Sequence, residues 1–262
     1  MKLGIIGKVD ESSFKKASEL GLDFLEFCIN VGNEPAKVFA DISKIKQWMK
    51  IYNVSVQSIG RWGSDRLDTE GNYVPEEFEN CKKLINVASE VGCPVFVCGC
   101  NYVQKLSYMD NLNRATEWFA SIIEYARPRG VKVAVYNCRW NNYIVDERTW
   151  KIVLGQLPEL GIKYDPSHCL VVGGNYLVEM RDWAERFYHF HVKGSLVIGG
   201  KLFDNPPAGM DQTDWGSIMA ILYAKKYEGG LSIEPHSAVW TGELGDKGVE
   251  FTVAYMKRLL FR

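Results

Sequence analysis

Polar side chains that can bind a cation or move a proton follow three strand-like segments in the second half of the chain. The segments are GIKYDPSH (161–168), FYHFHVKG (187–194) and GLSIEPHS (230–237). They supply Asp165, His168, His189, His191, Lys193, Glu234 and His236. Because ligands gather beyond the carboxyl ends of the strands in a parallel sheet, we expect these side chains to share one pocket.

Within this set, Asp165, His191 and Glu234 offer two carboxylates and an imidazole. Such a ligand set suits a divalent cation such as Mn, Zn, Co or Mg. Three protein ligands leave coordination positions open for a substrate. His168, three residues past Asp165, is a candidate for a further ligand or for a proton donor. His189 lies on the same side of its strand as His191, so periodicity does not decide which of the two histidines is the ligand.

Eight units of a strand-like run and a helix-like segment must position these residues. The strand-like runs cover 3–7, 24–28, 54–60, 94–99, 132–137, 162–168, 187–194 and 230–237. The helix-like segments cover the stretch from Ser12 as N-cap to Gly21, then 42–52, 75–91 and 110–126, and begin again near Glu147, Val178, Asp214 and Asp246. Each run is almost continuously apolar, which is typical of a parallel strand buried on both faces.

Eight such units predict an α/β fold, a single parallel eight-stranded (β/α)8 TIM barrel spanning residues 1–262. The competing architecture is an open doubly wound sheet. A dinucleotide-binding sheet of that kind should carry a glycine fingerprint after its first strand, and GKVDESS has none. The longest irregular segments, 29–41, 60–75 and 195–213, all follow strand ends. We expect them to form the mouth of the site.

The composition argues for a small-molecule partner. Lys and Arg number 31 against 32 Asp and Glu, so no net charge attracts nucleic acid or an anionic membrane. No apolar run approaches the roughly 20 residues of a membrane span, and we expect a soluble, cytoplasmic protein. The seven cysteines include no CxxC pair, which disfavours disulfides and a thiolate zinc site. A homo-oligomer stays open.

The motifs YDPSH, HFHVKG and SIEPHS resemble the later strands of the sugar phosphate isomerase/epimerase family, the xylose isomerase-like TIM barrels of carbohydrate metabolism. The resemblance implies a divalent metal held by a glutamate on strand five, an aspartate on strand six, the histidine of an HxK motif on strand seven and a glutamate on strand eight. In this chain those positions are Tyr136, Asp165, His191 and Glu234. The residues themselves indicate catalytic roles, with Glu234 as the base and with the metal, His168 or Lys193 as the polarising group.

Two positions depart from the family pattern. Tyr136 replaces the strand-five glutamate, and a phenol with a pKa near ~10 is neutral at pH 7, so it adds little charge to a metal site. Gly194 stands where an acidic residue is common after the HxK motif. Both changes predict that a divalent metal is held weakly or is absent.

Other residues are candidates for contacts to a sugar. Arg61 and Trp62 follow the third strand, and Arg139 and Trp140 follow the fifth; planar guanidinium and indole groups stack on and hydrogen-bond a sugar ring. Solvated loop positions are the alternative for these residues. Tyr136 is expected to line the same pocket. Glu26, at the end of the second strand, is a candidate for contacting substrate, for orienting a neighbour or for forming an ion pair.

Three functions follow from these residues. The first is a sugar or keto-sugar isomerase or epimerase that moves a proton next to a carbonyl with Glu234 as the base. A lyase acting on an oxidised sugar would use the same groups. The second is an apurinic-site endonuclease, which shares the barrel but needs extra histidines that VSVQSIG and PVFVCGC lack. The third is a non-catalytic carbohydrate-binding barrel, for which the loss at position 136 is the main support.

Overall fold

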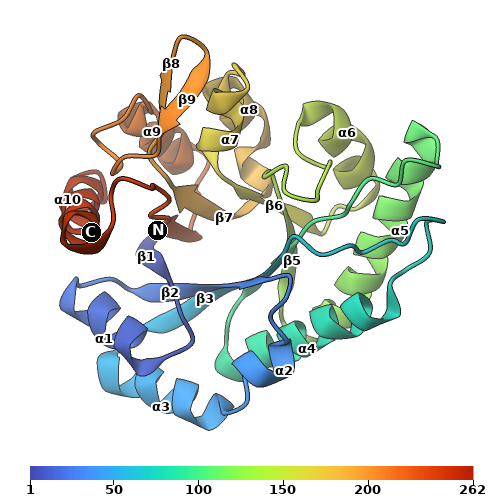
Figure 1. Cartoon of the computed structure of the whole chain (residues 1–262), viewed down its shortest axis with the longest axis horizontal. Coiled ribbons are helices and arrows are strands. Elements are labelled where there is room, and N and C mark those ends of the chain that lie inside the picture. The colour runs from blue at the N-terminus through green and yellow to red at the C-terminus, as the bar shows by residue number, and fades with distance from the viewer. Residues whose placement is uncertain (262) are drawn as a thin grey trace.

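The strands of the chain form a closed parallel barrel, as the sequence predicts. A computed structural model describes residues 1–261; the last residue of the predicted domain, Arg262, lies outside the described residues. Around the barrel the strand order is β1-β10-β7-β6-β5-β4-β3-β2, and each neighbouring pair is parallel (Figure 1). The competing open sheet is therefore excluded.

The barrel strands are β1 (Lys2–Gly7), β2 (Phe24–Asn30), β3 (Ser55–Trp62), β4 (Val95–Cys98), β5 (Lys132–Tyr136), β6 (Leu160–Tyr164), β7 (Phe187–Val192) and β10 (Gly230–Ile233). The α-helices are α1 (Glu11–Glu19), α2 (Pro35–Val38), α3 (Ile42–Tyr52), α4 (Pro75–Val91), α5 (Tyr108–Ala126), α6 (Glu147–Gln156), α7 (Pro166–Val171), α8 (Tyr176–Trp183), α9 (Trp215–Ala224) and α10 (Gly242–Arg258). Two short 3-10 turns are η1 (Arg127–Arg129) and η2 (Ala184–Arg186). None of the helices in residues 1–261 has the length and apolarity needed to cross a membrane.

Several element ends differ from the sequence-based prediction. Asp10, not Ser12, caps α1, because the Asp10 carboxylate accepts a hydrogen bond from the backbone N–H of Ser13. The predicted sixth run stops at Tyr164, where the chain turns into α7. The long segment 195–213 contains an antiparallel hairpin of β8 (Leu196–Ile198) and β9 (Lys201–Asp204), which projects from the barrel beside α7 and α8 (Figure 1).

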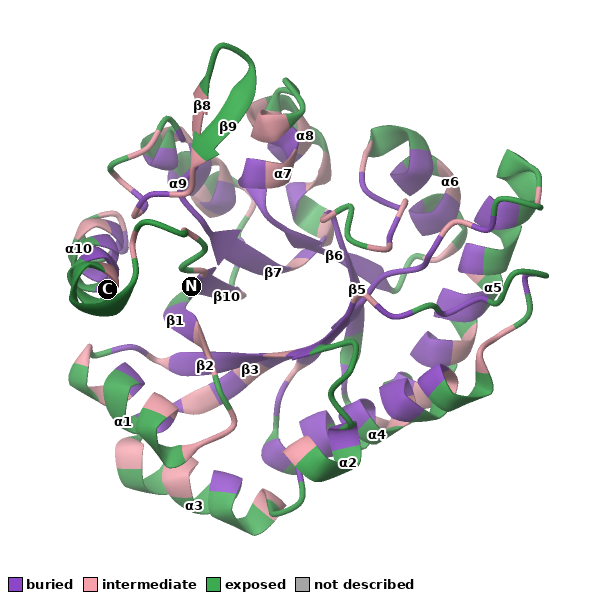
Figure 2. Cartoon of the chain, viewed as in Figure 1, coloured by how far each residue is buried: buried purple, intermediate pink, exposed green. Residues whose placement is uncertain are grey.

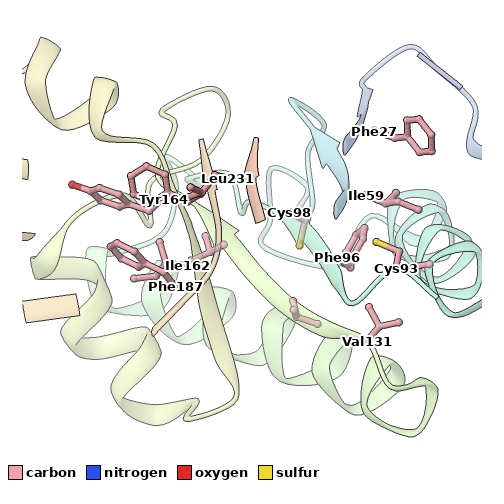
Figure 3. Close-up of a cluster of buried hydrophobic side chains, with 14 of the residues drawn as sticks. Phe27, Ile59, Cys93, Phe96, Cys98, Val131, Ile162, Tyr164, Phe187 and Leu231 are labelled. Atoms are coloured by element: carbon pink, nitrogen blue, oxygen red, sulfur yellow. The ribbon is translucent and has the colours of Figure 1, made fainter. Parts of the chain in front are cut away.

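The main hydrophobic core lies between the barrel and the surrounding helices. In Figure 2 the barrel strands are mostly buried, whereas the hairpin strand β9 and the outer sides of the helices are exposed. The outward-facing strand residues Ile59, Phe96 and Ile162 belong to this core, and Tyr164 stacks on Phe187 with ring centroids 4.5 Å apart (Figure 3). Burial on both faces explains why the strands read as unbroken apolar runs.

The interior of the barrel is divided into an apolar half and a polar half. Trp62, Val95, Val97, Ala134 and Tyr136, from β3, β4 and β5, pack together as a separate buried cluster. The other strands contribute buried polar side chains, namely Glu26, Lys163, His189, His191 and Ser232. The functional groups that the sequence indicates therefore project into one half of the barrel.

A buried ion-pair network fixes the loop that follows β3. Arg61 donates to both carboxylate oxygens of Glu77 on α4, at 2.9 and 2.5 Å, and to the carbonyl oxygens of Asn30 and Asn33. Arg66, fully buried, lies 3.5 Å from the same carboxylate. Burial alone would raise the pKa of Glu77, but the hydrogen bonds from Arg61 and Ser64 lower it from 4.5 to about 2.

This network predicts a large, pH-dependent loss of stability on Glu77→Gln. Two buried guanidinium groups lose their anion, so the free energy of unfolding at pH 7 should fall by about 3 kcal/mol. Because folding lowers the pKa of Glu77, its contribution is present above about pH 4.5 and is lost as the pH falls toward 2. The difference between wild type and variant, measured by denaturant unfolding, should therefore shrink in acid.

Glu79→Gln is the matched control, because Glu79 pairs with Lys82 on the exposed side of the same helix. It should cost less than about 1 kcal/mol. Equal losses in the two variants would show that the network does not stabilise the fold.

Candidate functional site

Asp165 is positioned by the start of a helix that the sequence-based prediction missed. It follows β6 and is the N-cap of α7: its Oδ1 accepts a hydrogen bond from the backbone N–H of Ser167 at 2.9 Å, and Pro166 occupies the first helical position. The helical turn brings His168 back toward Asp165, with Nε2 3.4 Å from Oδ2. The motif YDPSH thus holds an N-cap signal as well as two polar groups.

The two histidines of β7 meet Glu26 across the barrel. Glu26 Oε2 lies 2.8 Å from His189 Nε2 and 2.9 Å from His191 Nε2. The strands β2 and β7 are not neighbours in the sheet, so these contacts pass through the barrel interior. The other nitrogen of His191, Nδ1, lies 2.6 Å from Glu234 Oε2. Both histidines therefore face inward, and only His191 also reaches Glu234.

Two lysines bring positive charge to the same carboxylates. Lys193 Nζ lies 2.9 Å from Asp165 Oδ2 and 3.5 Å from Glu234 Oε2. Lys163, two residues before Asp165 on β6, lies 3.8 Å from Asp165 Oδ2. The sequence-based prediction omitted Lys163, although a charged residue in a buried strand, at the spacing that shares a face with Asp165, is a usable signal.

The charges set the protonation of the site. Burial alone would raise the pKa of Glu234, but Lys193 and His191 hold it well below its usual range. The ammonium of Lys193 likewise outweighs burial and lowers the pKa of Asp165. Burial lowers the pKa of His168 to about 4, although Asp165 opposes the effect. At neutral pH the site thus has ionised carboxylates and a neutral His168.

These groups open onto a cavity of about 600 Å³ at the mouth of the barrel. Its polar lining comes from Asn30, Lys163, His168, His191, Lys193, Glu234 and His236. Its less polar lining comes from Ile6, Cys28, Trp62, Cys138, Trp140 and Pro235. A cavity lined by both polar and aromatic side chains suits a small polar molecule with one apolar face.

Four predicted contact residues lie outside this lining. Tyr136 is fully buried, stacks on Trp62 with centroids 4.2 Å apart and donates its hydroxyl to the Trp140 carbonyl. Arg61 is bound to Glu77, outside the barrel. Arg139 is exposed and is not a lining residue, and Glu26 lies beneath His191. Of the predicted sugar contacts, the structure brings Trp62 and Trp140 to the cavity wall.

The packing of the chain explains why residue 194 is a glycine. A Cβ atom built at this position would overlap the carbonyl oxygen of Pro206, so the close passage of the following loop leaves no room for a side chain. The acidic residue expected from the resemblance does not fit here.

Two groups of described residues bring three possible metal-binding atoms within 4.8 Å of one another: Asp165, His191 and Glu234, and Glu26, His189 and His191. In the first group, the hydrogen bond from His191 Nδ1 to Glu234 needs a proton on that nitrogen, and a protonated ring nitrogen has no lone pair for a metal. Ammonium groups lie 2.9 and 3.8 Å from Asp165 Oδ2. As its side chains stand, this first group does not fit a divalent cation.

Comparison with known structures shows the same fold in two sugar epimerases and in a probable dehydratase. D-allulose 3-epimerase from Methylomonas sp. superposes with a TM-score of 0.80 at 16% identity, covering 99% of this chain and 98% of that one. The 3-keto-D-glucoside 4-epimerase from E. coli gives 0.77 at 14% identity, covering 98% and 99%. A probable 3-DHS dehydratase from Bacillus anthracis gives 0.76 at 13% identity, covering 98% and 99%.

No curated protein matches the sequence significantly. The family model described as xylose isomerase-like TIM barrel matches residues 14–258, which is nearly the whole chain. Together with the closed barrel and the polar cavity at its mouth, this match shows that the chain belongs to the xylose isomerase-like TIM-barrel family.

Proposed function

We propose that this protein, as a single domain over residues 1–262, is an isomerase- or epimerase-type enzyme that moves a proton at the carbon next to the carbonyl of a sugar or keto-sugar. The observation that carries the proposal is Glu234. One of its oxygens is bound to His191, while the other, Oε1, has His236 Nδ1 at 3.5 Å and belongs to a residue of the cavity wall. An ionised carboxylate with one oxygen held and one turned to a cavity suits a general base.

The other groups suit the remaining parts of such a reaction. Removing a proton next to a carbonyl builds negative charge on the carbonyl oxygen, and the ammonium of Lys193 is a donor for that oxygen. Neutral His168 is a donor or acceptor for a neighbouring hydroxyl. Trp62 and Trp140 offer ring faces for the apolar side of a sugar.

The site favours a reaction with one base. Inversion by two bases needs a second carboxylate on the opposite face of the substrate, and the residue at the strand-five position is Tyr136. Burial raises the pKa of this phenol above its ordinary value, and its hydroxyl donates to Trp140. Isomerisation through an enediolate needs only Glu234 and a polarising group. Elimination from an oxidised sugar has the same requirement, and one solved structure with this fold is a probable dehydratase.

The proposal predicts that Glu234→Gln abolishes proton exchange. Keto-sugars incubated with the protein in heavy water should take up deuterium at the carbon next to the carbonyl, followed by NMR. The variant should lower the exchange rate by about 10²–10⁴-fold, the usual contribution of a general base.

Glu243→Gln, on the exposed first turn of α10, is the control and should exchange at the wild-type rate. Exchange at full rate in Glu234→Gln would remove Glu234 from the mechanism. If no keto-sugar exchanges in the wild type although sugars bind, the non-catalytic carbohydrate-binding barrel becomes the better description.

Glu26 acts in this proposal through His191. By binding His191 Nε2 it turns Nδ1 toward Glu234, so it is a positioning residue. Burial alone would lower the pKa of His191, but Glu26 and Glu234 raise it. Glu26→Gln keeps the shape and removes the charge, so the pKa of His191 should fall.

The titration is measured from the ring ¹⁵N shifts of the four histidines, with Glu79→Gln as an exposed control. We also expect Glu26→Gln to lower the exchange rate more than it weakens sugar binding, because Glu26 does not line the cavity. An unchanged pKa of His191 would contradict the positioning role.

A further inference from the structure

We propose that the resident cations of this site are the ammonium groups of Lys193 and Lys163, which hold Asp165 and Glu234 in place of a divalent metal. The inference concerns how the buried carboxylates are neutralised. It rests on the geometry of the barrel interior and not on the reaction proposed above, so each can fail without the other.

Lys193 bridges the two carboxylates. Its Nζ lies 2.9 Å from Asp165 Oδ2 and 3.5 Å from Glu234 Oε2, and the residue is 5% exposed. Asp165 and Glu234 are the two residues that, with His191, make up the three-donor group. A cation that joins both oxygens is therefore already part of the chain.

Lys163 adds a second charge beside the first. It is 1% exposed, and its Nζ lies 3.8 Å from Asp165 Oδ2 and 5.3 Å from the centre of the Trp62 ring. A buried ammonium needs an anion nearby, and Asp165 is the carboxylate that Lys163 reaches. If Asp165 bound a metal ion through Oδ2, the ammonium of Lys163 would lie close to that ion, and the two positive charges would repel each other.

The neighbouring strand gives no compensating anion. In the register of β5 and β6, Tyr136 is the partner of Lys163. Its phenol is neutral and its hydroxyl donates to the carbonyl of Trp140. The adjacent inward positions thus hold a neutral group and a cation, the opposite of what a divalent ion requires.

His191, the third possible metal ligand, is also already hydrogen-bonded. Each ring nitrogen of His191 lies against a carboxylate oxygen, Nε2 at 2.9 Å from Glu26 and Nδ1 at 2.6 Å from Glu234. A metal could take Nδ1 only by replacing the proton shared with Glu234. All three donors are therefore already engaged by other groups of the chain. A substrate oxyanion would meet the hydrogen-bonding ammonium of a lysine instead of a metal ion acting as a Lewis acid.

Metal titration of the chelator-treated protein tests the proposal without any substrate. Calorimetry with Mn²⁺ or Zn²⁺ should give a dissociation constant above about 100 µM for the wild type. Lys163→Met and Lys193→Met each remove one charge and keep the length of the side chain, so each should tighten binding at least about tenfold. Lys193→Arg keeps the charge and should bind no better than wild type.

Lys50→Met, an exposed lysine on α3, is the matched control, and circular dichroism checks that every variant is folded. Binding of one equivalent to the wild type with a constant below about 1 µM would overturn the proposal even if a variant failed to fold. Unchanged affinity in folded Lys163→Met and Lys193→Met would overturn it too. Deuterium exchange that survives chelation would support it, whereas absence of exchange with every sugar would count only against the proposed function.

Discussion

The polar half of the barrel depends on the pairing of opposite charges that have been taken out of water. Glu26 and Asp165 are fully buried carboxylates and Glu234 is partly buried, and an isolated carboxylate in such a place would tend to become protonated. Imidazole rings from β7 and the two lysines prevent this. The arrangement fixes ring orientations and keeps the carboxylates ionised. Because His191 and Lys193 are each shared by two carboxylates, a change at one position alters the protonation of the others.

The fold could be predicted because burial on both faces leaves a strong mark on sequence. Eight apolar runs, separated by helical segments, match the eight barrel strands, and most helix starts fall within a few residues of the prediction. The short elements could not be predicted in this way. The six residues of α7 and the hairpin β8–β9 are too short for periodicity to indicate, and capping or turn chemistry decides them.

The candidate site was predicted where residues share a strand face and missed where the end of a strand was misjudged. Asp165, His191, Lys193 and Glu234 do converge. The sequence pattern predicts that β3 ends at residue 60, which would put both Arg61 and Trp62 at the mouth. The strand continues to Trp62, so the two side chains point to opposite faces. Contacts across the barrel, such as Lys163 with Trp62, depend on three-dimensional closure that one sequence does not display.

Asp165 has two structural roles, as the N-cap of α7 and as the anion that pairs with the lysines. Oδ1 holds the backbone of the helix that carries His168, while Oδ2 meets the lysines. Only aspartate satisfies both, since asparagine keeps the cap without the charge and glutamate is too long for the turn. A substitution at position 165 would therefore disturb the helix that carries His168, the pairing of charges or both. A change of charge at position 136 or 163 would alter the electrostatics beside the same aspartate without removing the cap of α7.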